Sequence, residues 1–187
     1  MGKLIVISAP SGAGKTSVVK RLLKNIPNLL FSISACSRKK RGNEKDGRDY
    51  HFITLEEFKN KINKGKFLEW EEVYKNHFYG TLKLSVEKVL TKNETMIFDL
   101  DVVGGLNIKK KYPQECLAIF IMPPSIEELK IRLKNRGSES NKSLEMRINN
   151  AKEEISRSNE FDETIINDDF GVCCEKAEEI IRKFIES

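Results

Sequence analysis

Apolar residues along the chain follow two patterns, short continuous runs and positions at helical spacing. Residues 4–7 form a run rich in β-branched side chains, which is typical of a strand buried on both faces of a parallel sheet. Similar runs recur at 96–98, 117–121 and 164–166. Helically spaced apolar residues lie between and after these runs, so strands and helices alternate. This alternation predicts an α/β fold with a parallel core sheet.

Turn and capping residues set the limits of the predicted helices. The first helix follows a glycine-rich loop and ends at Pro27. Residues 125–128, Ser-Ile-Glu-Glu, predict a capping box that opens another helix, with Leu129 and Leu133 facing inward. A last amphipathic helix is predicted at the C-terminus. Its inward positions are Ala177, Ile180, Ile181, Phe184 and Ile185.

The stretch from about residue 32 to 90 departs from this alternation. Short alternating runs at 32–34 and 50–53 are typical of short strands, and the charged, turn-forming segment SRKKRGNEKDGRD lies between them. The segment Thr-Leu-Glu-Glu at 54–57 predicts a second capping box. We therefore expect a small mixed domain inserted after the first strand–loop–helix unit.

A second interruption, KNRGSESNKS at residues 134–143, is polar and lacks apolar periodicity. Its turn residues and composition predict a mobile flap between two helices.

The first strand runs into the segment SAPSGAGKTS, residues 8–17. A loop of this kind between a strand and a helix binds phosphate, because its backbone N–H groups and the helix N-terminus converge on the anion. Lys15 is then expected to reach the β- and γ-phosphates, and Thr16 to offer its hydroxyl to Mg²⁺. The structural alternative is a glycine turn with an exposed lysine.

Ala9 stands where the usual pattern, G-x-x-x-x-G-K-[ST], has its first glycine. Positive φ would cost alanine about 1–2 kcal/mol. We therefore predict that Ala9 has negative φ and that Gly12 and Gly14 make the tight turns.

The composition is typical of one globular domain and limits the classes of ligand that we expect it to bind. The 187 residues are 39% hydrophobic and 33% charged, and the net charge of +5 suits an anionic ligand or a nucleic-acid surface. No apolar run approaches a membrane span, and no signal peptide is visible, so a cytoplasmic location is expected. The four cysteines are scattered and are expected to be reduced thiols, without a metal site.

A second group of residues can bind a phosphate monoester. Arg38 and Arg41 lie on one short stretch, with Tyr50 and Tyr79 farther along. Arginine binds phosphate through two N–H groups, and tyrosine adds a neutral donor. The alternative for the basic run is a solvated or nucleic-acid-binding surface. A switch GTPase is disfavoured because no N-K-x-D motif is present, and motor ATPases generally have longer chains.

Taken together, the motifs resemble those of the guanylate kinase family, whose members phosphorylate GMP with ATP. The resemblance covers the whole chain, residues 1–187, as a single domain. The matching stretches, in order, are APSGAGKTS, SRKKRGNEKDGRDYHFI, FLEWEEVYKNHFYGT, FDLDVVGGLNI, IFIMPPS, RLKNRG and IINDD.

The resemblance implies a three-layer phosphate-loop fold with three subregions. The core would comprise residues 1–31, 91–124 and 151–187, the GMP-binding insertion residues 32–90, and a mobile lid residues 125–150. The implied ATP-binding residues are Ala9, Pro10, Ser11, Gly12, Ala13, Gly14, Lys15, Thr16 and, beside adenine, Asn167.

The same resemblance assigns the acceptor residues. Arg38, Arg41, Tyr50 and Tyr79 would hold the GMP phosphate, while Ser34, Glu69, Thr81 and Asp101 would read the base. Guanine offers N1–H and N2–H₂ donors on one edge, and a buried carboxylate accepts both. Adenine lacks this donor pair and would leave the carboxylate unpaired.

The implied catalytic residues are Lys15 and the lid arginines Arg132, Arg136 and Arg147. Thr16 and, through water, Asp99 would hold Mg²⁺. The expected reaction is transfer of a phosphoryl group from ATP to GMP, and to dGMP, without a covalent intermediate. The expected partners are these nucleotides, with no nucleic acid and no membrane, in a monomer or homodimer. The alternatives are a kinase for another nucleoside monophosphate and a non-catalytic guanylate-kinase-like binding module.

Overall fold

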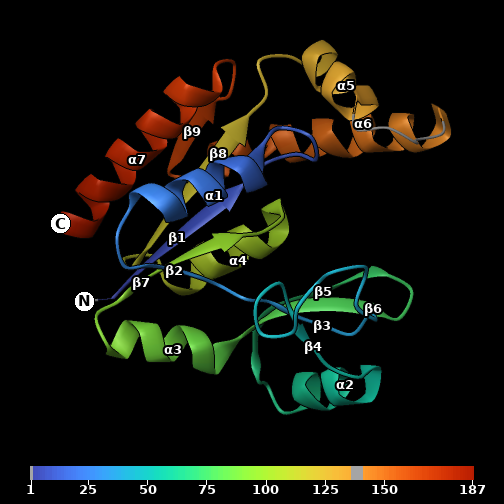
Figure 1. Cartoon of the computed structure of the whole chain (residues 1–187), viewed down its shortest axis with the longest axis vertical. Helices are drawn as coiled ribbons and strands as arrows, with labels where there is room; N and C mark the ends of the chain where they lie inside the picture. The colour runs from blue at the N-terminus through green and yellow to red at the C-terminus, as the bar shows by residue number, and fades with distance from the viewer. Residues whose placement is uncertain (1, 136–140) are drawn as a thin grey trace.

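The computed structural model describes residues 2–135 and 141–187, without the side chains of residues 141 and 142. Its core is a parallel sheet of five strands in the order β2-β7-β1-β8-β9 (Figure 1). The strands are β1 (Lys3–Ser8), β2 (Leu29–Phe31), β7 (Thr95–Asp99), β8 (Cys116–Met122) and β9 (Glu163–Ile166).

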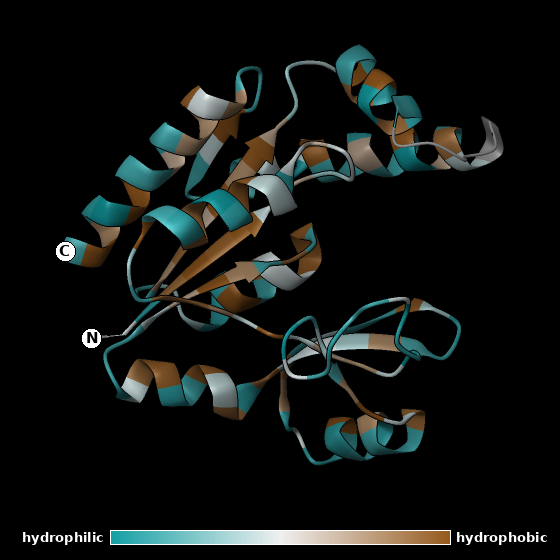
Figure 2. Cartoon of the chain, viewed as in Figure 1, coloured by the Kyte–Doolittle hydropathy of each residue, from teal (hydrophilic) through white to brown (hydrophobic). Residues whose placement is uncertain are grey.

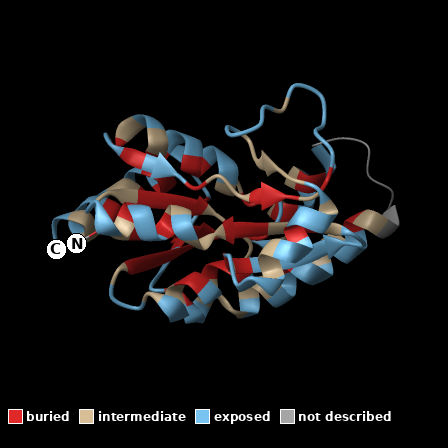
Figure 3. Ribbon diagram, turned by 90° about the horizontal axis from the view of Figure 1, so that it is seen from below, coloured by how far each residue is buried: buried red, intermediate tan, exposed pale blue. Residues whose placement is uncertain are grey.

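Alternate residues of β1 enter two hydrophobic cores, one on each face of the sheet. Ile5 and Ile7 pack with residues of α1 (Lys15–Asn25) and α7 (Phe170–Glu186). Leu4 and Val6 pack with residues of α3 (Lys83–Thr91) and α4 (Val102–Lys111). The apolar strands in Figure 2 and the buried strands in Figure 3 show this central layer. The predicted α/β fold with a parallel core sheet is therefore confirmed.

A second, mixed sheet lies within the stretch that departs from the alternation. Its order is β4-β3-β6-β5, with β3 and β4 parallel and the other pairs antiparallel. The helix α2 packs on it through Phe58, whose ring stacks on Phe67 at a centroid distance of 4.3 Å. The elements are β3 (Ala35–Cys36), β4 (His51–Phe52), α2 (Leu55–Asn63), β5 (Phe67–Tyr74) and β6 (His77–Leu82).

The run at 32–34 is not a strand, so this prediction was wrong. Here the chain crosses from one sheet to the other: the N–H of Ser32 still donates to Ile97 of β7, whereas the carbonyl of Ser34 accepts from His51 of β4. The capping box predicted at Thr54 is present, and at Ser125 one of the two bonds of the predicted box is present among the described residues. Thr54 and Glu57 form the reciprocal capping box of α2, and the Ser125 hydroxyl accepts from the N–H of Glu128.

Two further helices, α5 (Ile126–Asn135) and α6 (Asn141–Ser156), pack against each other and are followed by the short helix η1 (Ser158–Glu160). The centre of the predicted flap, residues 136–140, lies outside the described residues. Its flanks at 134–135 and 141–143 are helical rather than loop. In Figure 1, α5 and α6 and the second sheet lie on opposite sides of the core and extend to the right, where β1 ends. No helix in the described ranges combines the length and apolar character that a membrane span needs.

Candidate active site

The phosphate loop connects β1 to α1 and turns at two glycines. Gly12 has φ of 95° and Gly14 has φ of 98°. Ala9 does not have positive φ, because the non-glycine residues with positive φ in the described chain are all asparagines, at 28, 76 and 93. Ala9 is instead buried in the core, 4% exposed. The prediction for these three positions is confirmed.

Space as well as φ requires glycine at the two turns. A Cβ at Gly14 would lie 2.5 Å from Nδ2 of Asn167, and a Cβ at Gly12 would lie 2.9 Å from Cδ2 of Leu133. Both distances are shorter than any ordinary carbon contact, so a larger residue would push these neighbours away.

The two loop side chains that are predicted to be functional, Lys15 and Thr16, meet the end of β7. Nζ of Lys15 lies 2.8 Å from Oδ1 of Asp99 and donates to the carbonyl of Leu100 at 2.6 Å. The Thr16 hydroxyl donates to Oδ2 of Asp99 at 2.8 Å. The three side chains converge because β1 and β7 are parallel neighbours, so their carboxyl ends meet at the same edge of the sheet.

This group of oxygens fits a Mg²⁺ ion that keeps several of its waters. A hydroxyl and a carboxylate are the hard ligands that Mg²⁺ prefers, and phosphate oxygens of a substrate usually complete its shell. Among the described residues, no cluster of three or more His, Cys, Asp or Glu side chains could hold a metal ion alone. A metal here would therefore need Thr16, Asp99 and the nucleotide together.

A cleft of about 430 Å³ joins the phosphate loop to residues of the inserted region. Ser34 and Tyr50 line it from the inserted region, and Asp101 lines it from the start of α4. The structure thus brings these three predicted acceptor residues to the same cleft as the loop. The other lining residues are Ala9, Pro10, Ser11, Gly12, Gly14, Lys15, Thr16, Phe31, Ser32, Asp49, Asp99 and Glu154.

Arg38 is buried, and most of its donors are already used. Nη1 and Nη2 each lie 2.6 Å from an oxygen of Glu44, Nη1 also donates to the carbonyl of Lys39, and Nε donates to the Tyr79 hydroxyl at 2.9 Å. A guanidinium has five N–H donors, so one, on Nη2, is left without a partner among the residues that the structure describes. Arg38 therefore cannot bind a phosphate through two N–H groups while Glu44 holds it.

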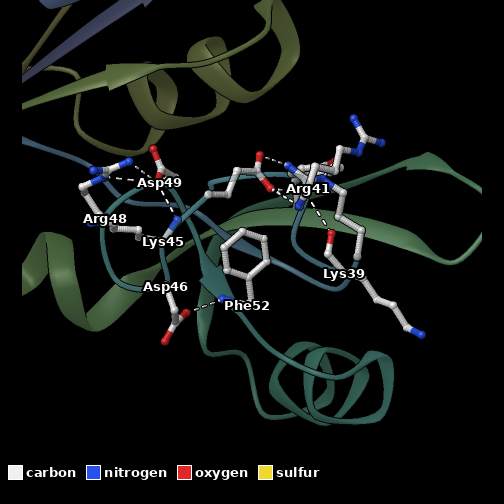
Figure 4. A network of polar contacts seen from close by, with 10 residues as sticks. Lys39, Arg41, Lys45, Asp46, Arg48, Asp49 and Phe52 are labelled. Carbon is white, nitrogen blue, oxygen red and sulfur yellow. Dashed lines mark hydrogen bonds and ion pairs between the residues drawn. The ribbon is translucent and has the colours of Figure 1, made fainter.

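Glu44 also organises the segment around Arg38. It accepts a further bond from the N–H of Arg41 at 2.8 Å, and these donors lower its pKa to about 2. The Arg41 side chain is exposed and has no hydrogen bond or ion pair within the described part of the chain. The rest of the segment is tied by Asp46 and Asp49, which accept backbone N–H bonds from Phe52 and Lys45 (Figure 4).

Two tyrosines stand beside Arg38, as their predicted shared role requires. The rings of Tyr50 and Tyr79 meet edge to face at 5.8 Å, and the Arg38 guanidinium lies 5.1 Å from the Tyr50 ring centre. Burial raises the pKa of Tyr50, so its hydroxyl remains a neutral donor.

Glu69 and Thr81 form a buried polar pair in the second sheet. They face each other across β5 and β6 and are 9% and 0% exposed. Within the described residues, Oε1 of Glu69 and Oγ1 of Thr81 have no hydrogen-bond partner. Burial raises the pKa of Glu69; the nearby hydroxyl and backbone N–H of Thr81 oppose this rise, and Asp101 adds to it. Buried polar atoms are normally paired, so the unpaired oxygen Oε1 of Glu69 marks a place for an outside donor.

Asp101 lies beside this pair. A Cβ at Gly104 would be 3.2 Å from Oε2 of Glu69 and 3.3 Å from Oδ2 of Asp101, so both carboxylates approach the same glycine. Asp101 also caps α4 by accepting the N–H of Gly104. The chain therefore places two carboxylates, one on β5 and one at the start of α4, around one small residue.

Sequence reasoning missed three glutamates of the site, Glu44, Glu71 and Glu154. Glu71 lies two residues after Glu69 on the same face of β5, a spacing that could have indicated it. Burial, together with Asp101, raises the pKa of Glu71. Glu154 lines the cleft from α6, and burial raises its pKa although Lys15 opposes this. No local pattern distinguishes Glu154 from the other charged residues of its helix.

The predicted lid arginines differ in the contacts that their side chains make. Arg132 pairs with Glu128 at 2.9 Å and donates to the carbonyl of Asn167 at 3.1 Å. Nη1 of Arg147 lies 3.5 Å from the Ser11 hydroxyl of the phosphate loop. Arg136 lies outside the described residues. Asn167, predicted beside adenine, turns its side chain to the phosphate loop and donates to the carbonyl of Ala13 at 2.7 Å.

Both the sequence and the fold of this chain match those of known proteins. A sequence model of the guanylate kinase family matches residues 1–184. The chain is 50% identical over 184 residues to a guanylate kinase of Bacteroides thetaiotaomicron, which covers 98% of this chain and 90% of that protein. It is also 50% identical over 186 residues to one of Porphyromonas gingivalis, with 99% of both chains covered. The crystal structure of guanylate kinase from Anaplasma phagocytophilum matches with a TM-score of 0.78 and 30% identity, over 97% of this chain and 85% of that one. The chain therefore belongs to the guanylate kinase family of enzymes.

Proposed function

We propose that this protein transfers the γ-phosphoryl group of ATP to the phosphate of GMP, and of dGMP, giving ADP and the nucleoside diphosphate. The observation that carries the proposal is the cleft shared by the phosphate loop and the acceptor residues Ser34, Tyr50 and Asp101. A site that only bound a triphosphate would have no need of this second half.

The buried pair Glu69 and Thr81 supports guanine as the base. A carboxylate oxygen without a partner, held in a buried site, gains most from a ligand that brings N–H donors. Guanine presents N1–H and N2–H₂ on one edge, whereas adenine presents no such pair. Discrimination against a base that leaves a buried carboxylate unpaired is large.

The reaction requires little covalent chemistry from the protein. The attacking group is a phosphate oxygen that is already anionic, so no general base is needed, and catalysis rests on position and charge. Successive N–H groups of the loop and Nζ of Lys15 would hold the donor phosphates in line with the acceptor. Arg132 and Arg147 would neutralise the negative charge that the transferred group carries.

Mg²⁺ would be held by Thr16 and, through water, by Asp99, and when bound it would supply charge neutralisation at the phosphate oxygens. Lys15 and Asp99 form an ion pair of 2.8 Å at the same place, so the metal and the lysine would share one carboxylate. The helices α5 and α6 would exclude water from the transferred group, because a site that activates ATP would otherwise hydrolyse it.

The phosphate of GMP would be bound by donors that converge from two segments. Tyr50 would face it from the cleft, with the remaining N–H of Arg38 beside the Tyr50 ring. Arg41, whose side chain is exposed beside them, would have to turn inward to join them. The positive charge that faces the acceptor is therefore smaller than two arginines would give, since Glu44 offsets that of Arg38.

An assay of ADP release with Mg²⁺·ATP and GMP, dGMP, AMP, CMP or UMP tests the proposal. We expect turnover with GMP and dGMP only. Turnover of AMP at the rate of GMP would refute base recognition by Glu69. Absence of turnover with every acceptor would favour a non-catalytic binding module instead.

A further inference from the structure

Asn167 is a buried residue that touches three parts of the donor site. It follows β9 directly, is 4% exposed, and its N–H donates to Met122 of β8 at 2.8 Å. Its side chain donates through Nδ2 to the carbonyl of Ala13 at 2.7 Å. Its own carbonyl accepts from Arg132 of α5 at 3.1 Å. The end of the core sheet, the phosphate loop and α5 therefore meet at one asparagine.

The bond to Ala13 fixes the orientation of one peptide group in the loop. The carbonyl of Ala13 and the N–H of Gly14 belong to the same planar trans peptide, so they point in opposite directions. While the carbonyl faces Asn167, the N–H of Gly14 faces away from it, and this N–H donates to none of the described residues. Gly14 lines the cleft.

Without this bond the peptide has little to hold it. Glycine populates positive and negative φ about equally, so the 13–14 peptide can rotate by half a turn at low cost. The rotated peptide would present its carbonyl oxygen, rather than its N–H, to the donor phosphates. A Cβ at residue 14 would lie only 2.5 Å from Nδ2 of Asn167, so the asparagine leaves no room for a larger residue there. The asparagine and the glycine are thus matched to each other.

We propose that Asn167 is a positioning residue that holds the 13–14 peptide so that the N–H of Gly14 faces the donor phosphates, and that it is not a reader of adenine. This inference rests on the proposed use of ATP as donor. It assigns the residue to the phosphates because its amide is buried against the loop and one of its two N–H donors is used on the Ala13 carbonyl there.

The test replaces the amide by an isosteric group that cannot donate in the ionised state. Asn167→Asp puts a carboxylate against the Ala13 carbonyl, and Asn167→Ala removes the donor without repulsion. Asn107→Asp, at an exposed position of α4, is the matched control for the change in charge. Dissociation constants are measured by titration calorimetry, so the result does not depend on turnover.

The ligands are ADP, inorganic tripolyphosphate and GMP. Tripolyphosphate carries phosphates and no base, so it separates the two roles. We expect both Asn167 variants to bind ADP and tripolyphosphate more weakly by the same factor, roughly 10- to 100-fold. GMP binding is expected to be unchanged, which also shows that the variants are folded. Asn107→Asp is expected to match the wild type throughout.

Loss of affinity for ADP with unchanged tripolyphosphate binding would overturn the inference, because it would indicate that Asn167 contacts the adenine base. Unchanged binding of both ligands would overturn it as well. Failure of the wild type to phosphorylate GMP would refute the proposed function, and these binding results would still stand separately.

Discussion

The two halves of the proposed site, one for the donor nucleotide and one for the acceptor, are built by different means. The donor half is one contiguous loop, residues 9–16, whose shape depends on two glycines with φ of 95° and 98° and on backbone N–H groups. The acceptor half collects Arg38, Tyr50, Glu69 and Asp101 from separate segments of the inserted region and the core. The first can be recognised in a short stretch of sequence. The second exists only after the chain has folded.

The halves also differ in how their polar groups are satisfied. In the donor half, Lys15 and Thr16 are paired with Asp99. In the acceptor half, Arg38 is held by Glu44, while an oxygen of Glu69 and one of Thr81 lack partners within the described residues. The acceptor half thus combines a guanidinium whose charge Glu44 already balances with buried oxygens that lack a hydrogen-bond partner among the described residues. Specificity is expected to lie with the latter, since an unpaired buried group penalises the wrong ligand.

The largest effect is expected from the donor half, at Lys15. Lys15→Ala should lower kcat/KM for ATP by about a thousandfold, because one preorganised charge at the transferring phosphates is lost. Circular dichroism should show an unchanged fold, and Lys20→Ala, at an exposed position of α1, should keep full activity. Full activity of Lys15→Ala would contradict the role given to this lysine. Steady-state kinetics with GMP held at saturation measure the difference.

In the acceptor half, Glu69→Gln should lower kcat/KM for GMP by roughly 100-fold, because the charged acceptor for two guanine donors is lost. Affinity for ADP should not change. Glu163→Gln, at an exposed position of β9, is the matched strand control. An equal loss for ADP and GMP would show a general structural defect instead. A kinetic comparison of GMP with AMP should also show reduced discrimination.

Stability gives an independent check on Glu69. Burial raises its pKa in the folded protein above its ordinary value of 4.5. The folded state therefore holds this proton more tightly than the unfolded state, and the resulting stabilisation is present below about pH 4.5 and lost as pH rises through the folded pKa. The free energy of unfolding of Glu69→Gln should gain on the wild type as pH increases from 4.5 to 8. Denaturant titrations at several pH values measure this difference, and a pH-independent difference would contradict it.

Glu44 offers a smaller effect whose sign is informative. If it holds Arg38 and the Arg41 N–H in place, Glu44→Gln should raise KM for GMP by about tenfold and leave KM for ATP unchanged. If its carboxylate instead competes with the acceptor phosphate, KM for GMP should fall. Glu56→Gln, on the exposed first turn of α2, controls for the charge. Initial rates at varied GMP distinguish the two outcomes.

The same contrast explains how much could be predicted from the sequence. The parallel core, the capping box at Thr54, the hydroxyl cap at Ser125 and the turns at Gly12 and Gly14 follow from local patterns, and the structure has them. The strand predicted at 32–34 was wrong, because the alternating polarity of this run belongs to a segment that crosses between the two sheets. Polar groups set by distant contacts were the hardest to predict.

Three glutamates illustrate this limit. Glu44 matters because a turn returns it to Arg38, six positions earlier, and Glu154 because α6 folds over the cleft. Glu71 shares a strand face with Glu69, but it is exposed, and only the fold brings it near Asp101. The sequence shows where such residues stand in the chain, but only the fold determines which groups they contact.

The smallest effect on function is expected where the loop departs from the usual pattern. Ala9→Gly restores the first glycine of the motif, yet Ala9 has ordinary φ and its methyl is buried among core residues. The substitution should lower the free energy of unfolding by about 1–2 kcal/mol, through the lost methyl and the freer unfolded chain. KM for ATP should change by less than about twofold, since the anion faces Gly12 and Gly14 instead. Gly14→Ala is the contrasting variant and should weaken ADP binding strongly. A marked gain in ATP affinity for Ala9→Gly would mean that the motif needs its first glycine for binding, and that packing does not explain the alanine.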